Sequence, residues 1–257
     1  MALSFKKPLI AFFVFFIFVA LFISCNSNTE SKTIEPKIIL SATYPLEIKQ
    51  PSGITFNHNY SMFWIIDGEE QRIYKADLNG NKLSRLAFKG EDLEGIFYNR
   101  SDSTLWVVEE ETREVIHLDL NGFVISRHST NISGTTNNGL EGIVLDENNN
   151  IYVLNEKDPS QVIALDENFN VAHQFGLPFA DDLSDMDYNP ITKYFFIVSD
   201  ESKAIYIWKP GEGLLNQFSL PFTKTEGITV NPTENKIVIV NDSLDTLYEY
   251  ELITNAE

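Results

Sequence analysis

Leu93-Glu94-Gly95-Ile96 is a four-residue sequence that returns along the chain as Leu140-Glu141-Gly142-Ile143 and as Thr225-Glu226-Gly227-Ile228. Looser copies are Pro51-Ser52-Gly53-Ile54 and Leu183-Ser184-Asp185-Met186. Measured at the third position of each copy, the steps along the chain are 42, 47, 43 and 42 residues. A period in this range is typical of repeat architectures, among them propellers whose repeat is a four-stranded blade. The spacing therefore predicts five similar units.

Within each unit, the recurring sequence opens one strand, and a second, strongly apolar strand follows after a polar turn. The second strands are Phe63-Trp64-Ile65-Ile66, Leu105-Trp106-Val107-Val108, Tyr152-Val153-Leu154, Phe195-Phe196-Ile197-Val198 and Ile237-Val238-Ile239-Val240. Unbroken apolar runs suit strands that are covered on both faces, as when sheets pack against sheets. We therefore expect Trp64, Trp106 and Trp208 in the core between blades. A third, alternating strand and a more polar fourth strand complete each unit, with Asn79-Gly80 and Asn121-Gly122 as hairpin signals.

The fifth unit ends at Ile253 after only three strands, while the strand-like segment Lys37–Pro45 precedes the first unit. Pairing this N-terminal strand with the last three would close a ring and cover the free sheet edges. We predict an all-β fold, a five-bladed propeller of four-stranded antiparallel blades over residues 37–253. A sixth blade would need about 40 more residues than the chain has.

The N-terminus has the layout of a secretory signal, with Lys6-Lys7, an apolar run from Pro8 to Ile23, and Ser24-Cys25 before a polar stretch. It resembles a bacterial lipoprotein signal, which predicts a signal peptide at 1–24, lipidation of Cys25 and a flexible tether over 25–36. The alternative is an uncleaved anchor, but the run is shorter than the roughly 20 residues that cross a bilayer. We expect an exported, membrane-anchored lipoprotein on the outer-membrane, periplasmic or surface side.

The chain is strongly acidic, with 19 Lys and Arg against 37 Asp and Glu and a formal net charge of −18. Nucleic acid binding requires clustered basic residues, so it is excluded as a function class. A cation or a cationic partner suits this charge better.

In a propeller, the first strand of each blade lines the axis, so Glu94, Glu141 and Glu226 should meet at one mouth of the channel. Carboxylates about 5 Å apart repel by roughly 3 kcal/mol per pair at an effective dielectric constant of about 20, unless they are protonated, solvated or bridged by a cation. Oxygen ligands favour Ca²⁺, with Asp185, Asn155 and Asn241 as further ligands. The alternative is that these glutamates accept backbone hydrogen bonds or are simply hydrated.

The second strands end at the same mouth, in acidic or amide residues. Supporting positions around the cation are therefore predicted at Glu109, Glu110, Glu156, Asp200 and Asp242. No catalytic residue is assigned, because no histidine is expected at the axis and no serine has a nucleophile motif such as Gly-x-Ser-x-Gly.

The repeated Leu-Glu-Gly-Ile sequence, the strand end Leu105-Trp106-Val107-Val108-Glu109-Glu110 and the five-unit length together resemble the SdiA-regulated family of bacterial propellers, which are related to NHL-repeat proteins. The resemblance extends from about Glu35 to Ile253. It implies an exported five-bladed propeller with a calcium site at the channel, resting here on Glu94, Glu141 and Glu226.

Three functions fit these features. The leading hypothesis is a membrane-anchored, calcium-binding propeller that binds an unidentified protein or small molecule and has no enzymatic activity. The alternative is a metal-dependent hydrolase of the lactonase or esterase type, with Glu109, Glu110 or Asp200 as the general base. The third is a structural interaction protein without a metal.

Overall fold

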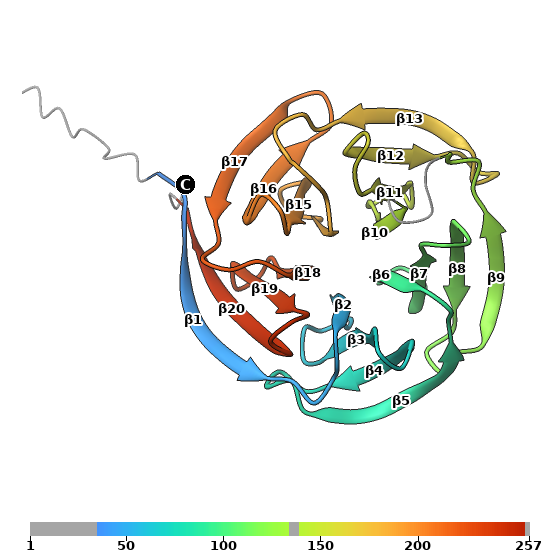
Figure 1. The fold of residues 1–257 in the computed structure, drawn as a ribbon, viewed down its shortest axis with the longest axis horizontal. Helices are drawn as coiled ribbons and strands as arrows, with labels where there is room; N and C mark the ends of the chain where they lie inside the picture. The colour runs from blue at the N-terminus through green and yellow to red at the C-terminus, as the bar shows by residue number, and fades with distance from the viewer. Residues whose placement is uncertain (1–34, 134–138, 255–257) are drawn as a thin grey trace, which may run out of the picture. The chain divides into compact units, whose positions relative to one another are not determined.

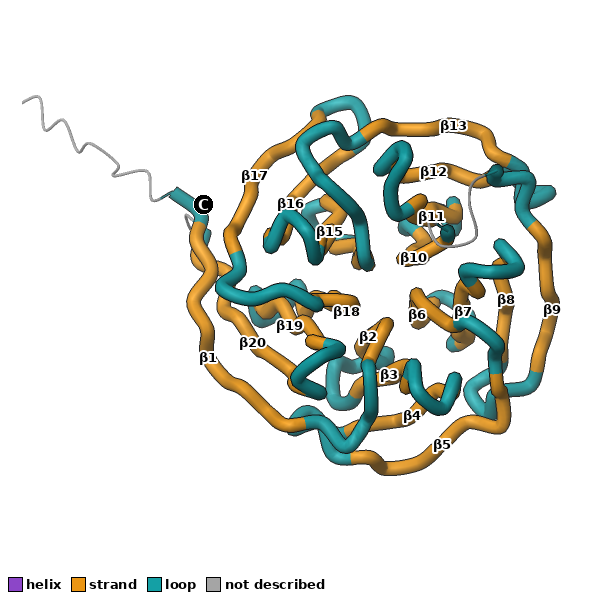
Figure 2. The backbone as a smooth tube through the Cα atoms, in the orientation of Figure 1, coloured by secondary structure: helices purple, strands orange, loops and turns teal. Residues whose placement is uncertain are grey.

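The computed structural model of the protein describes residues 35–133 and 139–254. The predicted signal peptide, Cys25 and residues 25–34 of the tether lie outside the described residues. The described part of the chain consists of strands and turns without helices (Figure 2), so it contains no helix that could cross a membrane.

Five antiparallel sheets of four strands each make up the described fold. Blade 1 contains β2 (Pro51–Phe56), β3 (Phe63–Asp67), β4 (Arg72–Ala76) and β5 (Lys82–Lys89), and blade 2 contains β6 (Leu93–Asn99), β7 (Thr104–Glu109), β8 (Glu114–Leu118) and β9 (Val124–Ser129). Blade 3 contains β10 (Leu140–Leu145), β11 (Ile151–Asn155), β12 (Gln161–Leu165) and β13 (Val171–Gly176), and blade 4 contains β14 (Asp185–Asn189), β15 (Tyr194–Ser199), β16 (Ala204–Lys209) and β17 (Gly213–Ser219). Blade 5 contains β18 (Thr225–Asn231), β19 (Lys236–Asn241), β20 (Thr246–Ile253) and β1 (Lys37–Pro45).

The sheets are arranged as a ring, with the first strand of each blade toward the centre and the last at the perimeter (Figure 1). The inner strands are β2, β6, β10, β14 and β18. This arrangement confirms the predicted all-β, five-bladed propeller.

The ring is closed by the N-terminal strand, as the sequence predicted. β1 pairs antiparallel with β20, from Lys37 opposite Ile253 to Pro45 opposite Thr246. Blade 5 is therefore built from both ends of the described chain, and the outer edge of β20 is covered by β1.

The apolar second strands lie in the core between blades. Every residue of β3 is buried, and β7, β15 and β19 are buried after their first residue. Trp64, Trp106 and Trp208 are at most 9% exposed and pack within clusters of buried hydrophobic residues. This confirms the prediction that they lie in the core.

The glycine of the recurring sequence is required because neighbouring inner strands approach each other closely. A Cβ atom on Gly95 would lie 2.2 Å from the carbonyl oxygen of Glu141, and one on Gly53 would lie 2.4 Å from that of Glu94. The register of the first hairpin also shifts at this position in blades 1, 2, 3 and 5. In blade 4, Asp185 takes the place of the glycine, and β14 pairs with β15 from Asp185 onward without a shift.

Polar side chains around the axis tie three of the inner strands, β2, β14 and β18, to the next blade. Thr55 Oγ1 accepts a hydrogen bond from the Tyr98 amide at 3.2 Å, and Thr229 Oγ1 accepts one from the Phe56 amide at 3.3 Å. Asp187 accepts one from the Val230 amide at 2.8 Å. These bonds satisfy backbone donors on the inner strands of blades 1, 2 and 5, where no further strand pairs.

Candidate functional site

The three glutamates of the recurring sequence converge at one end of the ring. Glu94, Glu141 and Glu226 line a single cavity of about 320 Å³, at the end of the channel where the inner strands begin. Each lies beside the register shift of its strand, and such bulges re-aim side chains out of the regular strand alternation. Ser52 lines the cavity in blade 1, where it donates a hydrogen bond to the Leu93 carbonyl at 2.8 Å.

A second set of acidic residues comes from the turns that follow the second strands. Glu110, Glu156 and Asp242 line the same cavity, and Asp200 lines an adjoining one with Glu141 and Glu226. Each of these four residues directly follows the last residue of its second strand. The mouth therefore carries seven carboxyl groups from two positions of the blade repeat.

The last residues of the second strands are buried and do not line the cavity. Their side chains form hydrogen bonds or ion pairs within the protein. Asp67 Oδ1 accepts a hydrogen bond from the Glu70 amide at 2.9 Å, and Asn241 Oδ1 accepts one from the Leu244 amide at 3.0 Å. Glu109 forms an ion pair with Arg127 at 2.9 Å and is 1% exposed. Of the predicted supporting residues, Glu110, Glu156 and Asp242 thus face the cavity and Glu109 does not.

Carboxylate oxygens gather in two groups, one within blade 2 and one shared by blades 2 and 3. Asp92, Glu94 and Glu110 form one group, and Glu110, Glu141 and Glu156 form another, with oxygens within 4.8 Å of one another in each. Glu110 belongs to both groups, whereas Glu226 lines the cavity without joining either. Asp92 was not predicted; it precedes β6 and stands two residues before Glu94.

The pKa values of the five glutamates that line the cavity are raised, chiefly because burial disfavours the charged form. Burial and the neighbouring Asp92 carboxylate raise the pKa of Glu94 well above its usual value, and burial and Glu94 do the same for Glu141. Burial raises the pKa of Glu226 to about 7, against the opposing effect of Lys224. The pKa values of Glu110 and Glu156 are raised by burial as well.

Basic residues form ion pairs with only some of the mouth carboxylates. Lys224 lies 3.0 Å from Asp200 and 3.5 Å from Glu226, and Lys157 lies 3.2 Å from both Glu156 and Glu201. Among the described residues, no lysine or arginine is within ion-pair distance of the carboxylates of Asp92, Glu94, Glu110 or Glu141. These four carboxylates therefore have no direct ion pair with a described residue, although the Arg113 charge opposes the rise in the pKa of Glu110.

The three further predicted ligands lie apart from this cavity. Asn155 donates hydrogen bonds to the carbonyls of Lys157 and Pro159 at 3.0 and 2.9 Å, and Asn241 donates one to the Thr223 carbonyl at 2.5 Å. Asp185 is 1% exposed, and its Oδ2 accepts a hydrogen bond from the Ile228 amide at 2.9 Å. Burial raises the pKa of Asp185 well above its usual value, and its Oδ1 has no hydrogen-bond partner among the described residues.

The side chains at the mouth fit a hard divalent cation. They offer carboxylate oxygens, which Ca²⁺ prefers, and a cation between them would offset both the mutual repulsion and the burial of charge. Within the described residues, no histidine lines this cavity. His117 stacks on Trp106 with ring centroids 4.1 Å apart, and His128 stacks on Phe169 at 3.7 Å.

A five-bladed β-propeller with an acidic channel mouth is the class of protein that this fold and site define. Residues 37–220 match the SdiA-regulated family. The chain belongs to that family, and the match confirms the resemblance seen in its repeats.

The other comparisons concern only the fold. A comparison with curated proteins found no match. Among solved structures, glutaminyl cyclase from Myxococcus xanthus aligns with a TM-score of 0.67 at 12% identity, over 88% of this chain and 100% of that chain. A Bacteroides caccae protein of unknown function aligns with a TM-score of 0.56 at 9% identity, over 74% and 70%. Kuenenia stuttgartiensis hydrazine synthase aligns with a TM-score of 0.54 at 9% identity, over 80% and 84%. At these identities, the likeness concerns the propeller fold.

Proposed function

We propose that the acidic mouth binds a divalent cation of the calcium type and that the propeller serves as a binding module for a protein or small-molecule ligand. The observation that carries this proposal is the position of Glu110. Its carboxylate is shared by two groups of three acids, and among the described residues Glu110 itself forms no ion pair with a basic residue. A cation held between blades 2 and 3 would be bound by Glu94, Glu110 and Glu141, with Asp92 and Glu156 beside them.

Ca²⁺ is the favoured ion because it accepts six to eight oxygen ligands in irregular geometry, whereas Mg²⁺ requires a compact octahedron and keeps its water. The carboxylates here come from different blades and are only partly buried, which suits a larger, more adaptable coordination sphere. The cation would also stabilise the ring, because ligands from two blades would then be linked through it.

Isothermal titration calorimetry on the full chain, stripped of metal with a chelator, tests the proposal. We expect Ca²⁺ to bind more tightly than Mg²⁺ and to raise the Tm of the protein. Glu141→Gln should weaken Ca²⁺ binding by tenfold or more, on the order of the loss of one charged ligand. Glu167→Gln is the matched control, because it removes the same charge from an exposed turn of blade 3. Absence of heat and of a thermal shift in the wild-type protein would refute the cation site.

A metal-dependent hydrolase is the second candidate, and one observation favours it. A carboxyl group with a pKa near 7, as at Glu226, is suited to general acid–base catalysis at neutral pH, and it lines the same cavity as the proposed cation. Known neighbours in fold include proteins named as enzymes, but a shared fold does not assign a reaction. Screening lactones and aryl esters with Ca²⁺ and with chelator separates the two functions: turnover that requires Ca²⁺ and is lost in Glu226→Gln would favour the hydrolase.

The proposed location is outside the cytoplasm, with the propeller tied to a membrane through a lipid on Cys25. This proposal rests on the sequence of the N-terminus. Mass spectrometry of the mature chain from its native membrane tests it, since a diacylated or triacylated N-terminal Cys25 is expected and an unmodified Met1 would contradict it.

A further inference from the structure

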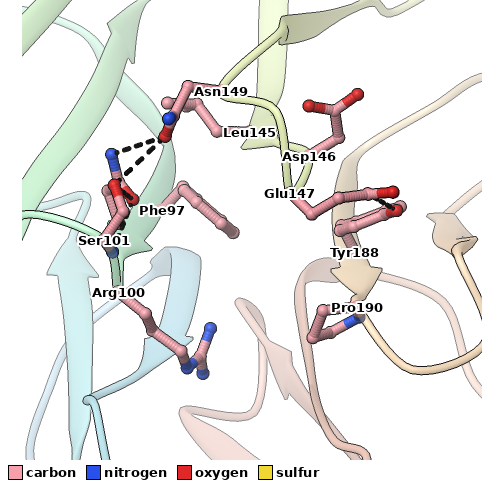
Figure 3. A pocket seen from close by; sticks show the side chains of 10 residues that line it. Phe97, Arg100, Ser101, Leu145, Asp146, Glu147, Asn149, Tyr188 and Pro190 are labelled. Atoms are coloured by element: carbon pink, nitrogen blue, oxygen red, sulfur yellow. Dashed lines mark hydrogen bonds between the residues drawn. The ribbon is translucent and has the colours of Figure 1, made fainter.

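A second cavity lies at the opposite end of the inner strands from the acidic mouth. It has a volume of about 190 Å³ and is lined by the ends of β6, β10 and β14 and the turns that follow them (Figure 3). On β6, Glu94 is the second residue and Asn99 is the last, so the two cavities are separated by roughly 16 Å along the strand. The second cavity is therefore distinct from the proposed cation site.

The walls of this cavity are largely apolar. Phe97, Leu145 and Tyr188 line it and are each at most 6% exposed, and Pro190 lines the side opposite Phe97 (Figure 3). A dry protein cavity of about 150 Å³ accommodates benzene. The cavity therefore has room for one ring with a small substituent.

Arg100 brings a positive charge and one unpartnered hydrogen-bond donor to this apolar space. Its guanidinium lies 4.6 Å from the centre of the Tyr60 ring, and its Nε is buried without a hydrogen-bond partner among the described residues. In Figure 3 the side chain runs beneath the Phe97 ring, and no dashed line joins the guanidinium to another side chain of the pocket. A buried N–H group without a partner costs free energy, and a ligand acceptor would recover it.

The carboxylates near Arg100 are occupied by other donors. Burial raises the pKa of Asp187 and the Arg100 charge opposes this rise, while the carboxylate accepts hydrogen bonds from Thr229 Oγ1 and the Val230 amide, both at 2.8 Å. Glu147 is paired with Lys193 at 2.6 Å and hydrogen-bonded by the Tyr188 hydroxyl. In the described part of the chain, none of these acids forms an ion pair with Arg100.

Asp146, the remaining acid of the cavity wall, is held in its own turn. Its Oδ1 accepts hydrogen bonds from the amides of Asn148 and Asn150 at 2.8 and 2.9 Å. In Figure 3 its carboxylate lies on the far side of the cavity from Arg100. The position opposite the guanidinium is therefore open to an acceptor from outside the protein.

We propose that this cavity, the Arg100 pocket, binds a small aromatic or branched apolar carboxylate. The carboxylate accepts hydrogen bonds from the Arg100 guanidinium, whose planar donors match its geometry, and the apolar body packs against Phe97, Leu145 and Pro190. The site is independent of the cation at the acidic mouth.

Calorimetric titration with phenylacetate and with phenylacetamide tests this proposal. The full chain is used in a maltoside detergent with EDTA present, so that a metal at the other mouth cannot hold the carboxylate. We expect phenylacetate to bind about tenfold more tightly than the amide, because only the carboxylate forms a charged pair with Arg100. In Arg100→Gln the two probes should bind equally. Arg85→Gln is the matched control, since Arg85 is an exposed arginine of the outer strand β5, and it should bind as the wild type does.

Three results would overturn the proposal: no binding of phenylacetate by the wild-type chain, equal affinities for the two probes, or the same loss in Arg85→Gln as in Arg100→Gln. If Arg100→Gln does not fold, a crystal structure of the wild-type chain with phenylacetate decides the matter. A carboxylate within hydrogen-bond distance of Arg100 supports the pocket, and phenylacetate elsewhere or absent refutes it. Because metal is removed throughout, these outcomes are independent of whether the acidic mouth binds Ca²⁺.

Discussion

Glu226 shows how a single carboxyl group couples the mouth of the channel to pH. Burial raises its pKa to about 7 in the folded protein, against about 4.5 in the unfolded chain. Between these values the folded state binds more protons than the unfolded state, so its contribution to stability is present at low pH and is lost as the pH rises through about 7.

We therefore predict that Glu226→Gln stabilises the metal-free protein at pH 8 by on the order of 1–3 kcal/mol, that most of the gain is lost by about pH 5, and that it disappears below about pH 4.5. The value is limited because the side chain is 21% exposed and Lys224 lies 3.5 Å away. Denaturant unfolding in EDTA across this range measures the difference. A gain that is larger at pH 5 than at pH 8 would show that the carboxyl group is not destabilised by burial.

At the scale of the element, the close packing of neighbouring inner strands depends on the glycine of the recurring sequence. A methyl group on Gly95 would clash with backbone atoms of the next blade, the Glu141 carbonyl oxygen at 2.2 Å and Gly142 Cα at 2.8 Å, and backbone atoms cannot rotate away. We predict that Gly95→Ala destabilises the protein by about 3 kcal/mol.

The matched control is Gly176→Ala at the end of β13, where an added Cβ would have no atom within 4 Å. Its effect on stability should stay within about 1 kcal/mol, with a small gain possible from the stiffer unfolded chain. Thermal unfolding of both variants compares them, and equal effects would contradict the close approach of the inner strands.

The inner strands also show how much of the site could be predicted from the sequence. The spacing of the five recurring sequences predicted the number of blades, and the glutamates of three of them correctly pointed to one mouth. Glu109 and Glu110 are adjacent in the sequence, which left open which of the two faces the cavity. The direction of each side chain depends on how the chain turns after β7. Asp92 carries no repeat signal, and Arg100 lies in an ordinary polar turn, so neither could be recognised before the blades were assembled.

At the scale of the whole molecule, the ring depends on β1. This strand covers the edge of β20 and joins the two ends of the described chain in one blade. We predict that a chain lacking residues 1–45 unfolds with a Tm lower by on the order of 10–20 °C, because blade 5 loses its outer strand and exposes an unpaired edge.

A chain lacking only residues 1–34 is the control, because it retains all of β1. It should keep a single cooperative transition by circular dichroism and differential scanning calorimetry. Equal Tm values for the two truncated chains would mean that closure by β1 contributes little to the stability of the ring.

The central claim is that acidic side chains from two neighbouring blades hold a divalent cation at the channel mouth. Anomalous diffraction from crystals grown with Ca²⁺ tests it most directly. We predict a peak bound by carboxylate oxygens of Glu94, Glu110 and Glu141, which is absent in crystals of Glu141→Gln. An ordered mouth without a peak, or a peak only at another surface, would contradict the claim.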